Sequence, residues 1–183
     1  GNYRLNTKVP SVSLNIEGGA YRLAKTFIEN GKKRPALFCT VSEEYYSSLC
    51  YYAGYKRALE EYGLSELILN MDSFLKNEPE FLAFMKAEKP DAILMEYPSY
   101  YNFGSWCLDN AYPYHPAVGF FVTPHVFRLY RQSRNFCWVC FEEAPKCAVK
   151  YLLNHIINGT ELKSIVIEPH IPGVDDHESC FLY

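Results

Sequence analysis

A pair of cysteines is the feature of this sequence whose spacing most directly suggests chemistry. Cys137-Trp138-Val139-Cys140 is a C-x-x-C motif, the spacing of redox dithiols and of one half of many zinc sites. A redox dithiol is favoured at a helix N-terminus, which lowers the thiol pKa, whereas this motif precedes Phe141 in a stretch that reads as extended. Because the chain has no second C-x-x-C, zinc would need two further ligands from elsewhere. Packing thiols are the favoured interpretation, and a thiol-redox or metal-binding enzyme domain is the alternative.

The end of the chain collects residue types that bind metals, namely His170, Asp175, Asp176, His177 and Cys180. Their spacing matches no closed metal site, so we predict no bound metal. The sequence also has no nucleophile elbow, no glycine-rich phosphate loop and no pair of carboxylates at helical spacing. We therefore predict that the chain is not an enzyme and needs no cofactor.

Tyrosines form the third group of chemically interesting residues, 16 of them in 183 residues. Tyr45, Tyr46, Tyr51 and Tyr52 cluster in the first half of one expected helix. Each ring combines an apolar body with a hydroxyl, which suits clefts and interfaces. Two interpretations stay open for this cluster: half-buried helix packing, or contact with a ligand by at least one ring.

Composition limits the class of protein. A hydrophobic content of 49% can bury the core of one domain, with part of a second, and a net charge of −3 provides no broad basic surface for nucleic acid. Seven cysteines, an odd number, fit reduced thiols in the cytoplasm, and no apolar run approaches the roughly 20 residues of a membrane span. We predict a cytoplasmic protein without a membrane segment.

Strands and helices are expected to alternate along the chain. Short apolar runs predict strands, and apolar residues at helical spacing predict helices; Ser42 is expected to cap the helix that carries Glu43 and Glu44 in its first turn. Strands are expected at 9–15, 35–40, 66–70, 92–95, 117–122 and 165–167, and helices at 18–31, 42–63, 77–90, 99–109 and 141–158.

This alternation predicts an α/β fold, a doubly wound and mainly parallel sheet with helices on both faces. Ligands of such folds bind beyond the carboxyl ends of the strands. Tyr45 and Tyr46 follow one strand end, Glu96 and Tyr97 follow a second, and His125 lies in the loop after a third. The predicted ligand-binding residues are these five together with Tyr51 and Thr123, that is, Tyr45, Tyr46, Tyr51, Glu96, Tyr97, Thr123 and His125.

Four segments in order carry a resemblance: GGAYRLAKTFIENGKKRPALF, YYAGYKRALEEYGL, KPDAILM and FEEAPKCAVKYLLNHIINGTELKSIVIEPHI. Together they resemble the later part of the effector-binding domain of lactose-repressor and galactose-repressor type (LacI/GalR) transcriptional regulators. The resemblance implies a periplasmic-binding-protein-like fold of two lobes, truncated at its N-terminal side. Residues 35–140 would form the complete second lobe, and residues 1–34 and 141–183 would be pieces of the first.

The positions that hold polar sugar contacts in that family are occupied here by Tyr51, by Tyr97 and Pro98, and by Val122 and Thr123. The resemblance therefore leaves open both a sugar held by tyrosines and a less polar effector. It also leaves two apolar helix faces, around Leu23 to Ile28 and around Ala148 to Ile156, that need a covering surface.

The resemblance implies a ligand-sensing domain that closes on a small metabolite, a sugar being one candidate. It would act as a homodimer and pass the change to a DNA-binding headpiece outside this chain. The alternative from the residues alone is a thiol-redox or metal-binding enzyme domain on a flavodoxin-like scaffold, using Cys137 and Cys140.

Overall fold

The computed structural model describes residues 10–40, 45–70, 78–96, 116–122, 136–140 and 143–171. Its main feature is a parallel sheet of five strands in the order β3-β2-β4-β5-β6. These strands are Pro35–Cys39 (β2), Ile68–Asn70 (β3), Ala92–Met95 (β4), Ala117–Val122 (β5) and Phe136–Cys140 (β6). The predicted α/β fold with a mainly parallel sheet is confirmed.

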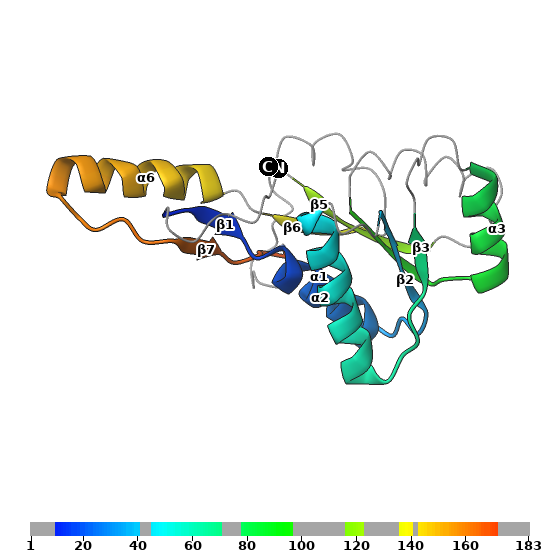
Figure 1. Ribbon diagram of the computed structural model, residues 1–183. Coiled ribbons are helices and arrows are strands. Elements are labelled where there is room, and N and C mark those ends of the chain that lie inside the picture. Colours follow the sequence, from blue (N-terminus) through cyan, green and yellow to red (C-terminus); the bar gives the residue numbers. More distant parts are fainter. Residues whose placement is uncertain are drawn as a thin grey trace.

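Helices cover both faces of this sheet (Figure 1). Helices α1 (Ile16–Glu29) and α2 (Tyr46–Tyr62) pack against each other and on one face, where Leu37 and Cys39 join their buried cluster. Successive strand residues point to opposite faces of the sheet, so Phe38 lies on the other face. The centroid of its ring is 5.2 Å from that of the Phe81 ring. Phe81 belongs to α3 (Glu78–Glu88), which completes the second layer.

A smaller unit lies beside the five-stranded sheet. Strands β1 (Val12–Leu14) and β7 (Ile165–Ile167) form a parallel pair, and helix α6 (Glu143–Asn158) packs against β1 and extends away from the rest of the chain (Figure 1). Each strand of the pair has three residues, and in the described part of the chain no further strand joins them. After β7 the chain returns to the larger unit, because Ile171 is buried in the cluster formed by α1, α2 and the sheet.

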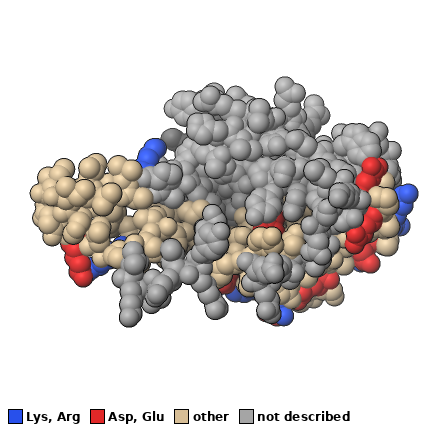
Figure 2. Space-filling model, turned by 45° about the horizontal axis from the view of Figure 1, so that its top comes forward, with Lys and Arg blue, Asp and Glu red and all other residues tan. Residues whose placement is uncertain are grey.

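The two apolar helix faces noted in the sequence differ in their surroundings. Leu23, Ala24 and Phe27 of α1 are buried against α2 and the sheet, and Gly119 of β5 lies so close that an added Cβ would be 2.8 Å from Leu23 and Phe27. The α6 face is exposed instead, with Ile156 and Ile157 prominent. In Figure 2 the α6 end of the molecule, at the left, is mostly tan, whereas charged side chains gather over α3 at the right.

The expected start of α2 is wrong. The helix begins at Tyr46, and Tyr45 at its N-cap has φ −110° and ψ 95°, an extended conformation that no helix starting at Ser42 could contain. The first turn of the observed helix contains no acidic residue, and Glu43 and Glu44 lie outside the described residues. The predicted end at Gly63 is confirmed, with a left-handed φ of 65° that suits glycine. The helix expected at 99–109 lies outside the described residues.

Candidate functional site at the carboxyl ends of β2 and β4

The strand order contains a reversal between β2 and β4. From β2 the chain adds β3 on one side, and then crosses over to add β4, β5 and β6 on the other. The connection that leaves the carboxyl end of β2 therefore runs to one side of the sheet, and the connection that leaves β4 runs to the other. Open α/β sheets hold their ligands at such switch points. Cys39 ends β2, and Glu96 follows β4 directly, so both residues stand at this point.

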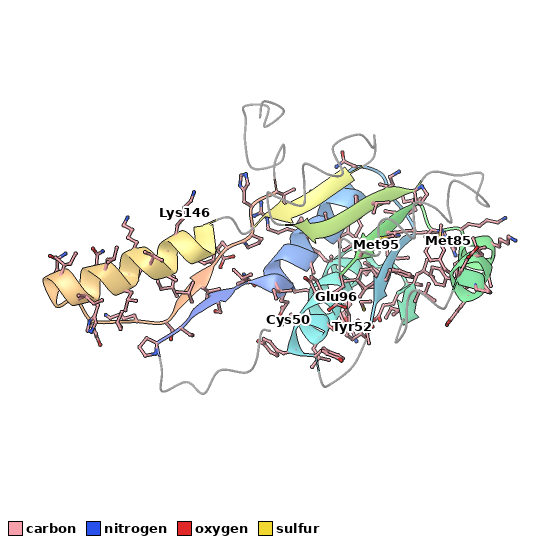
Figure 3. All side chains as sticks on the ribbon, turned by 90° about the horizontal axis from the view of Figure 1, so that it is seen from above. Cys50, Tyr52, Met85, Met95, Glu96 and Lys146 are labelled. Atoms are coloured by element: carbon pink, nitrogen blue, oxygen red, sulfur yellow. The ribbon has the colours of Figure 1, made fainter. Side chains whose placement is uncertain are left out.

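A buried carboxylate occupies the switch point. The Glu96 side chain is 2% exposed, and its Oε1 accepts a hydrogen bond from the Ser48 hydroxyl at 2.7 Å. Ser48 is equally buried and is the third residue of α2. The backbone N–H of Glu96 donates to the carbonyl of Phe38 in β2, at 3.2 Å. Glu96 thus joins the ends of two neighbouring strands to the first turn of α2, beside which it is labelled in Figure 3.

The start of α2 explains why a carboxylate is tolerated there. The first turn of a helix carries backbone N–H groups without intrahelical partners and a partial positive charge. Tyr45 provides no side-chain cap, and the first turn has no acidic residue of its own. Glu96 brings its carboxyl group next to this turn from a distant part of the chain, through its contact with Ser48.

The thiol beside this carboxylate is unreactive in character. Burial, and then the negative charge of Glu96, raise the pKa of the Cys39 thiol from its ordinary 9.0 to about 12. Cys39 is free, as are Cys50 and Cys147 among the described cysteines. Burial also raises the pKa of Cys50 above its usual range. Both thiols favour their neutral form, so neither has the low pKa of a catalytic nucleophile.

The predicted tyrosines fall into two groups. Tyr45 is 55% exposed and Tyr46 is 44% exposed at the start of α2, at the carboxyl edge of the sheet, where their rings are accessible to a ligand. Tyr51 is 7% exposed and packs with Ile16 and Ala20 of α1. The structure therefore brings Tyr45, Tyr46 and Glu96 to one edge, whereas Tyr51 lies in the interface between the two helices.

Three predicted site residues, Tyr97, Thr123 and His125, lie outside the described residues, as do four of the metal-binding residue types near the C-terminus, Asp175, Asp176, His177 and Cys180. Sequence reasoning missed Ser48 and Cys39. Cys39 could have been found, because it ends an apolar strand, and the strand-end rule applies to it as it does to Glu96. Ser48 has no such signal, since its role depends on a contact with a residue 48 positions away.

The C-x-x-C motif lies inside strand β6, paired with β5 from Cys137 opposite Gly119 to Cys140 opposite Val122. This position differs from the helix N-terminus that a redox dithiol uses. Among the described residues, no three His, Cys, Asp or Glu side chains are grouped so that they could hold a metal ion. No helix in the described ranges is both long and apolar enough to span a bilayer.

Comparison with known proteins gives similarity at the level of structure alone. No family model and no curated protein matches the sequence. The transcriptional repressor AscG of Escherichia coli superposes with a TM-score of 0.73 at 18% identity, over 93% of this chain and 65% of its own. A LacI family regulator of Enterococcus faecium, solved with bound ribose, gives 0.71 at 13% identity, over 92% and 65%.

A sugar-binding LacI family regulator of Escherichia coli, solved in complex with phosphate, gives a TM-score of 0.73 at 19% identity, over 93% of this chain and 64% of its own. The chain thus spans slightly less than two thirds of the length of these three proteins. The resemblance seen in the sequence segments is confirmed at the level of fold: this chain has the α/β fold of the LacI family transcription regulators.

Proposed function

We propose that this chain is a ligand-sensing part of a LacI-type transcriptional regulator, which binds a small metabolite at the carboxyl ends of β2 and β4. The observation that supports the proposal is that the exposed Tyr45 and Tyr46 begin α2 at the carboxyl edge of the sheet, the same edge at which Glu96 follows β4. In such folds this edge is the usual place for a small ligand.

The chemistry of the edge supports a hydroxylated ligand. Exposed tyrosine rings can stack on the apolar face of a sugar, and their hydroxyls can hydrogen-bond to it. A regulator of the same fold holds ribose. We infer that a sugar is one candidate effector here, and a less polar metabolite held by the same rings is the other.

We also propose how the chain divides into the two lobes. Residues 35–140, which contain the five-stranded sheet, would form the second lobe, with α1 packed on its face. The β1–β7 pair and α6 would be pieces of the first lobe. Closure of the lobes on the effector would shift an existing equilibrium and pass the change to a DNA-binding headpiece outside this chain. A homodimer and a cytoplasmic location are parts of the same proposal.

The alternative function, a thiol-redox or metal-binding enzyme on this scaffold, receives less support. Its cysteines, Cys137 and Cys140, lie within a paired strand, and the structural neighbours reported above are transcription regulators. Labelling of thiols in the folded chain, together with a zinc assay, separates the two candidates. Stoichiometric zinc or a rapidly reacting vicinal dithiol would favour the enzyme.

The experiment that tests the sensing function is a screen of sugars and related metabolites for an increase in the melting temperature of the purified chain. A ligand that binds only the native state must raise its apparent stability. We expect at least one metabolite to do so, and Tyr46→Ala to weaken its effect.

The matched control is Tyr62→Ala. Tyr62 is also an exposed tyrosine of α2, but it lies at the opposite end of the helix, at the amino edge of the sheet. An equal loss in both variants, or no loss in either, would count against the proposed site.

A further inference from the structure

We propose that Glu96 occupies the anion-binding position at the start of α2 and thereby restricts the effector to neutral or cationic molecules. This inference rests on the proposed function for its biological meaning, because it defines the class of ligand that the same site accepts. The physical claim about Glu96 can be tested without the effector.

Helix N-termini at the carboxyl edge of an α/β sheet are ready-made binding places for phosphate and carboxylate groups. α2 is a helix of 17 residues that begins at this edge. Neither a side-chain cap nor an acidic residue in its own first turn uses the positive end of the helix. Within residues 45–62, therefore, no side chain satisfies this positive end, which suits an anionic group.

Glu96 is the group that fills the position. Its carboxylate accepts the hydrogen bond of Ser48 within the first turn of α2, and its side chain is almost completely buried. The backbone N–H of Glu96 is tied to the carbonyl of Phe38, which extends the pairing of β2 and β4. The sheet thus holds the backbone of Glu96, and the Ser48 hydroxyl holds its carboxylate at the start of the helix.

Among the described residues, the basic side chains of the segment before β2 and of α2 that bear on this site lie at the other edge of the sheet or are already paired. Lys33 and Arg34 precede β2 and therefore lie at its amino end, where their backbone N–H groups bind the Asp91 carboxylate at 2.7 and 3.0 Å. Arg57, on α2, is paired with Glu17 on α1 at 2.9 Å. A second anion placed at the start of α2 would meet the repulsion of a buried carboxylate in a medium of low dielectric constant.

The test uses inorganic phosphate as the probe and the melting temperature of the intact chain as the readout. The wild-type chain, Glu96→Gln and Glu96→Ala are compared in phosphate and in chloride at equal ionic strength. We expect no specific effect of phosphate on the wild type. In Glu96→Ala we expect a saturable rise of about 2–4 °C, and in Glu96→Gln a smaller rise, because the amide removes the charge but fills the space.

Glu60→Gln is the matched control, because it removes one carboxylate from the opposite end of the same helix. It should respond to phosphate as the wild type does. Glu96→Gln guards against a failure to fold, since its amide oxygen can still accept the hydrogen bond of Ser48. Circular dichroism establishes that each variant is folded before the comparison is made.

The proposal is overturned if the wild type itself is stabilised by phosphate with saturation, or if both folded Glu96 variants respond no more than Glu60→Gln. Neither result depends on finding an effector. A failed metabolite screen would instead contradict the proposed sensing function and leave the phosphate result unaffected, so the two failures are distinguishable.

Discussion

Tyr55 ties α2 to the sheet and to the strand that follows the helix. Its ring is fully buried, and its hydroxyl accepts a hydrogen bond from the backbone N–H of Leu67 at 2.9 Å. The same hydroxyl lies 3.0 Å from the carbonyl of Pro35 and 3.1 Å from that of Leu67, to one of which it donates its proton. Burial raises the pKa of Tyr55 well above its usual range, so the donor stays protonated.

The change Tyr55→Phe should therefore lower the free energy of unfolding by about 1–3 kcal/mol, because it leaves the partly buried N–H of Leu67 without its acceptor. Urea denaturation followed by circular dichroism measures this loss. Tyr52→Phe is the control on the same helix, since the Tyr52 hydroxyl bonds to the exposed carboxylate of Glu66, at 3.0 Å. An equal loss in both variants would contradict the assignment of Tyr55 as the buried anchor.

Cys39 predicts a dependence of stability on alkaline pH. Its folded-state pKa of about 12 exceeds the 9.0 of an unperturbed thiol, so the unfolded chain loses this proton first as the pH rises. The stabilisation from Cys39 is complete below pH 9 and is lost progressively between pH 9 and 12, with a slope of at most about 1.4 kcal/mol per pH unit.

The measurement compares the free energies of unfolding of the wild type and Cys39→Ala at pH 8 and at pH 10.5. The variant should lose less stability than the wild type over this interval. Parallel loss in the two proteins would show that Cys39 titrates alike in the folded and unfolded states.

At the scale of elements, the crossing of α1 and α2 depends on Gly54. A Cβ at this position would lie 2.7 Å from the backbone nitrogen of Tyr21 and 2.9 Å from the Cβ of Ala20, and would overlap the carbonyl oxygen of Glu17. The two helices can approach this closely only because α2 has no side chain here.

Gly54→Ala should lower the free energy of unfolding by about 1–3 kcal/mol through overpacking. The sign is diagnostic, because the same change in an uncrowded helix raises stability by about 1 kcal/mol. Thermal or urea denaturation gives the answer. A stabilised variant would mean that the helices are farther apart than the structure has them.

The boundaries of the larger elements could be predicted from the sequence, and the start of α2 could not. Apolar runs such as PALFC and AILM, and the glycine at position 63, are local signals, and the structure places β2, β4 and the end of α2 accordingly. Beside the start of α2 the Ser48 hydroxyl bonds to Glu96, an acidic residue that the local pattern did not assign to this turn. A signal that comes from 48 positions away cannot be found in a window of neighbouring residues.

Helix α6 exposes more apolar surface than an isolated helix of a folded unit should. Ile157 is 73% exposed, and an open groove of about 620 Å³ follows one side of the helix. The groove is lined by Lys146, Val149, Lys150, Leu153, Asn154 and Ile157. Exposed apolar surface of this kind favours association with another surface.

We therefore expect the isolated chain to self-associate in a concentration-dependent manner, and the double change Leu153→Lys with Ile157→Lys to suppress this. The melting temperature should not fall, because both side chains are already exposed. Sedimentation velocity over a range of concentrations measures the association. Ala87→Lys, on the exposed side of α3, is the control for added charge and should associate as the wild type does. If the double variant of α6 also associates as the wild type does, the apolar surface of α6 does not drive the association.

At the scale of the whole molecule, the two parts of the chain differ in how completely their cores are enclosed. The five-stranded sheet carries helices on both faces, and its central strands β2 and β4 are fully buried. The β1–β7 pair has α6 beside it and touches the cluster of α1 and α2 through Leu14, and its strand residues are half-buried or exposed. Two-stranded sheets are marginally stable alone, so the larger unit provides most of the stability.

Part of the candidate site could likewise be predicted from the sequence. The strand-end rule placed Tyr45, Tyr46 and Glu96 together, because parallel strands deliver their carboxyl ends to one edge whatever their order. The rule does not say which way a helix turns its side chains, and so it could not distinguish the exposed Tyr46 from Tyr51, which packs against α1. That distinction requires the crossing of α1 and α2.

The most direct test of the proposed site is amide hydrogen exchange of the chain with and without a metabolite that stabilises it. Binding at the carboxyl edge predicts slower exchange in residues 45–51 and 94–96, and unchanged exchange at the amino edge around Arg34 and Asp91 and along α6. Protection confined to the amino edge or to α6, with none at the start of α2 or the end of β4, would contradict the account.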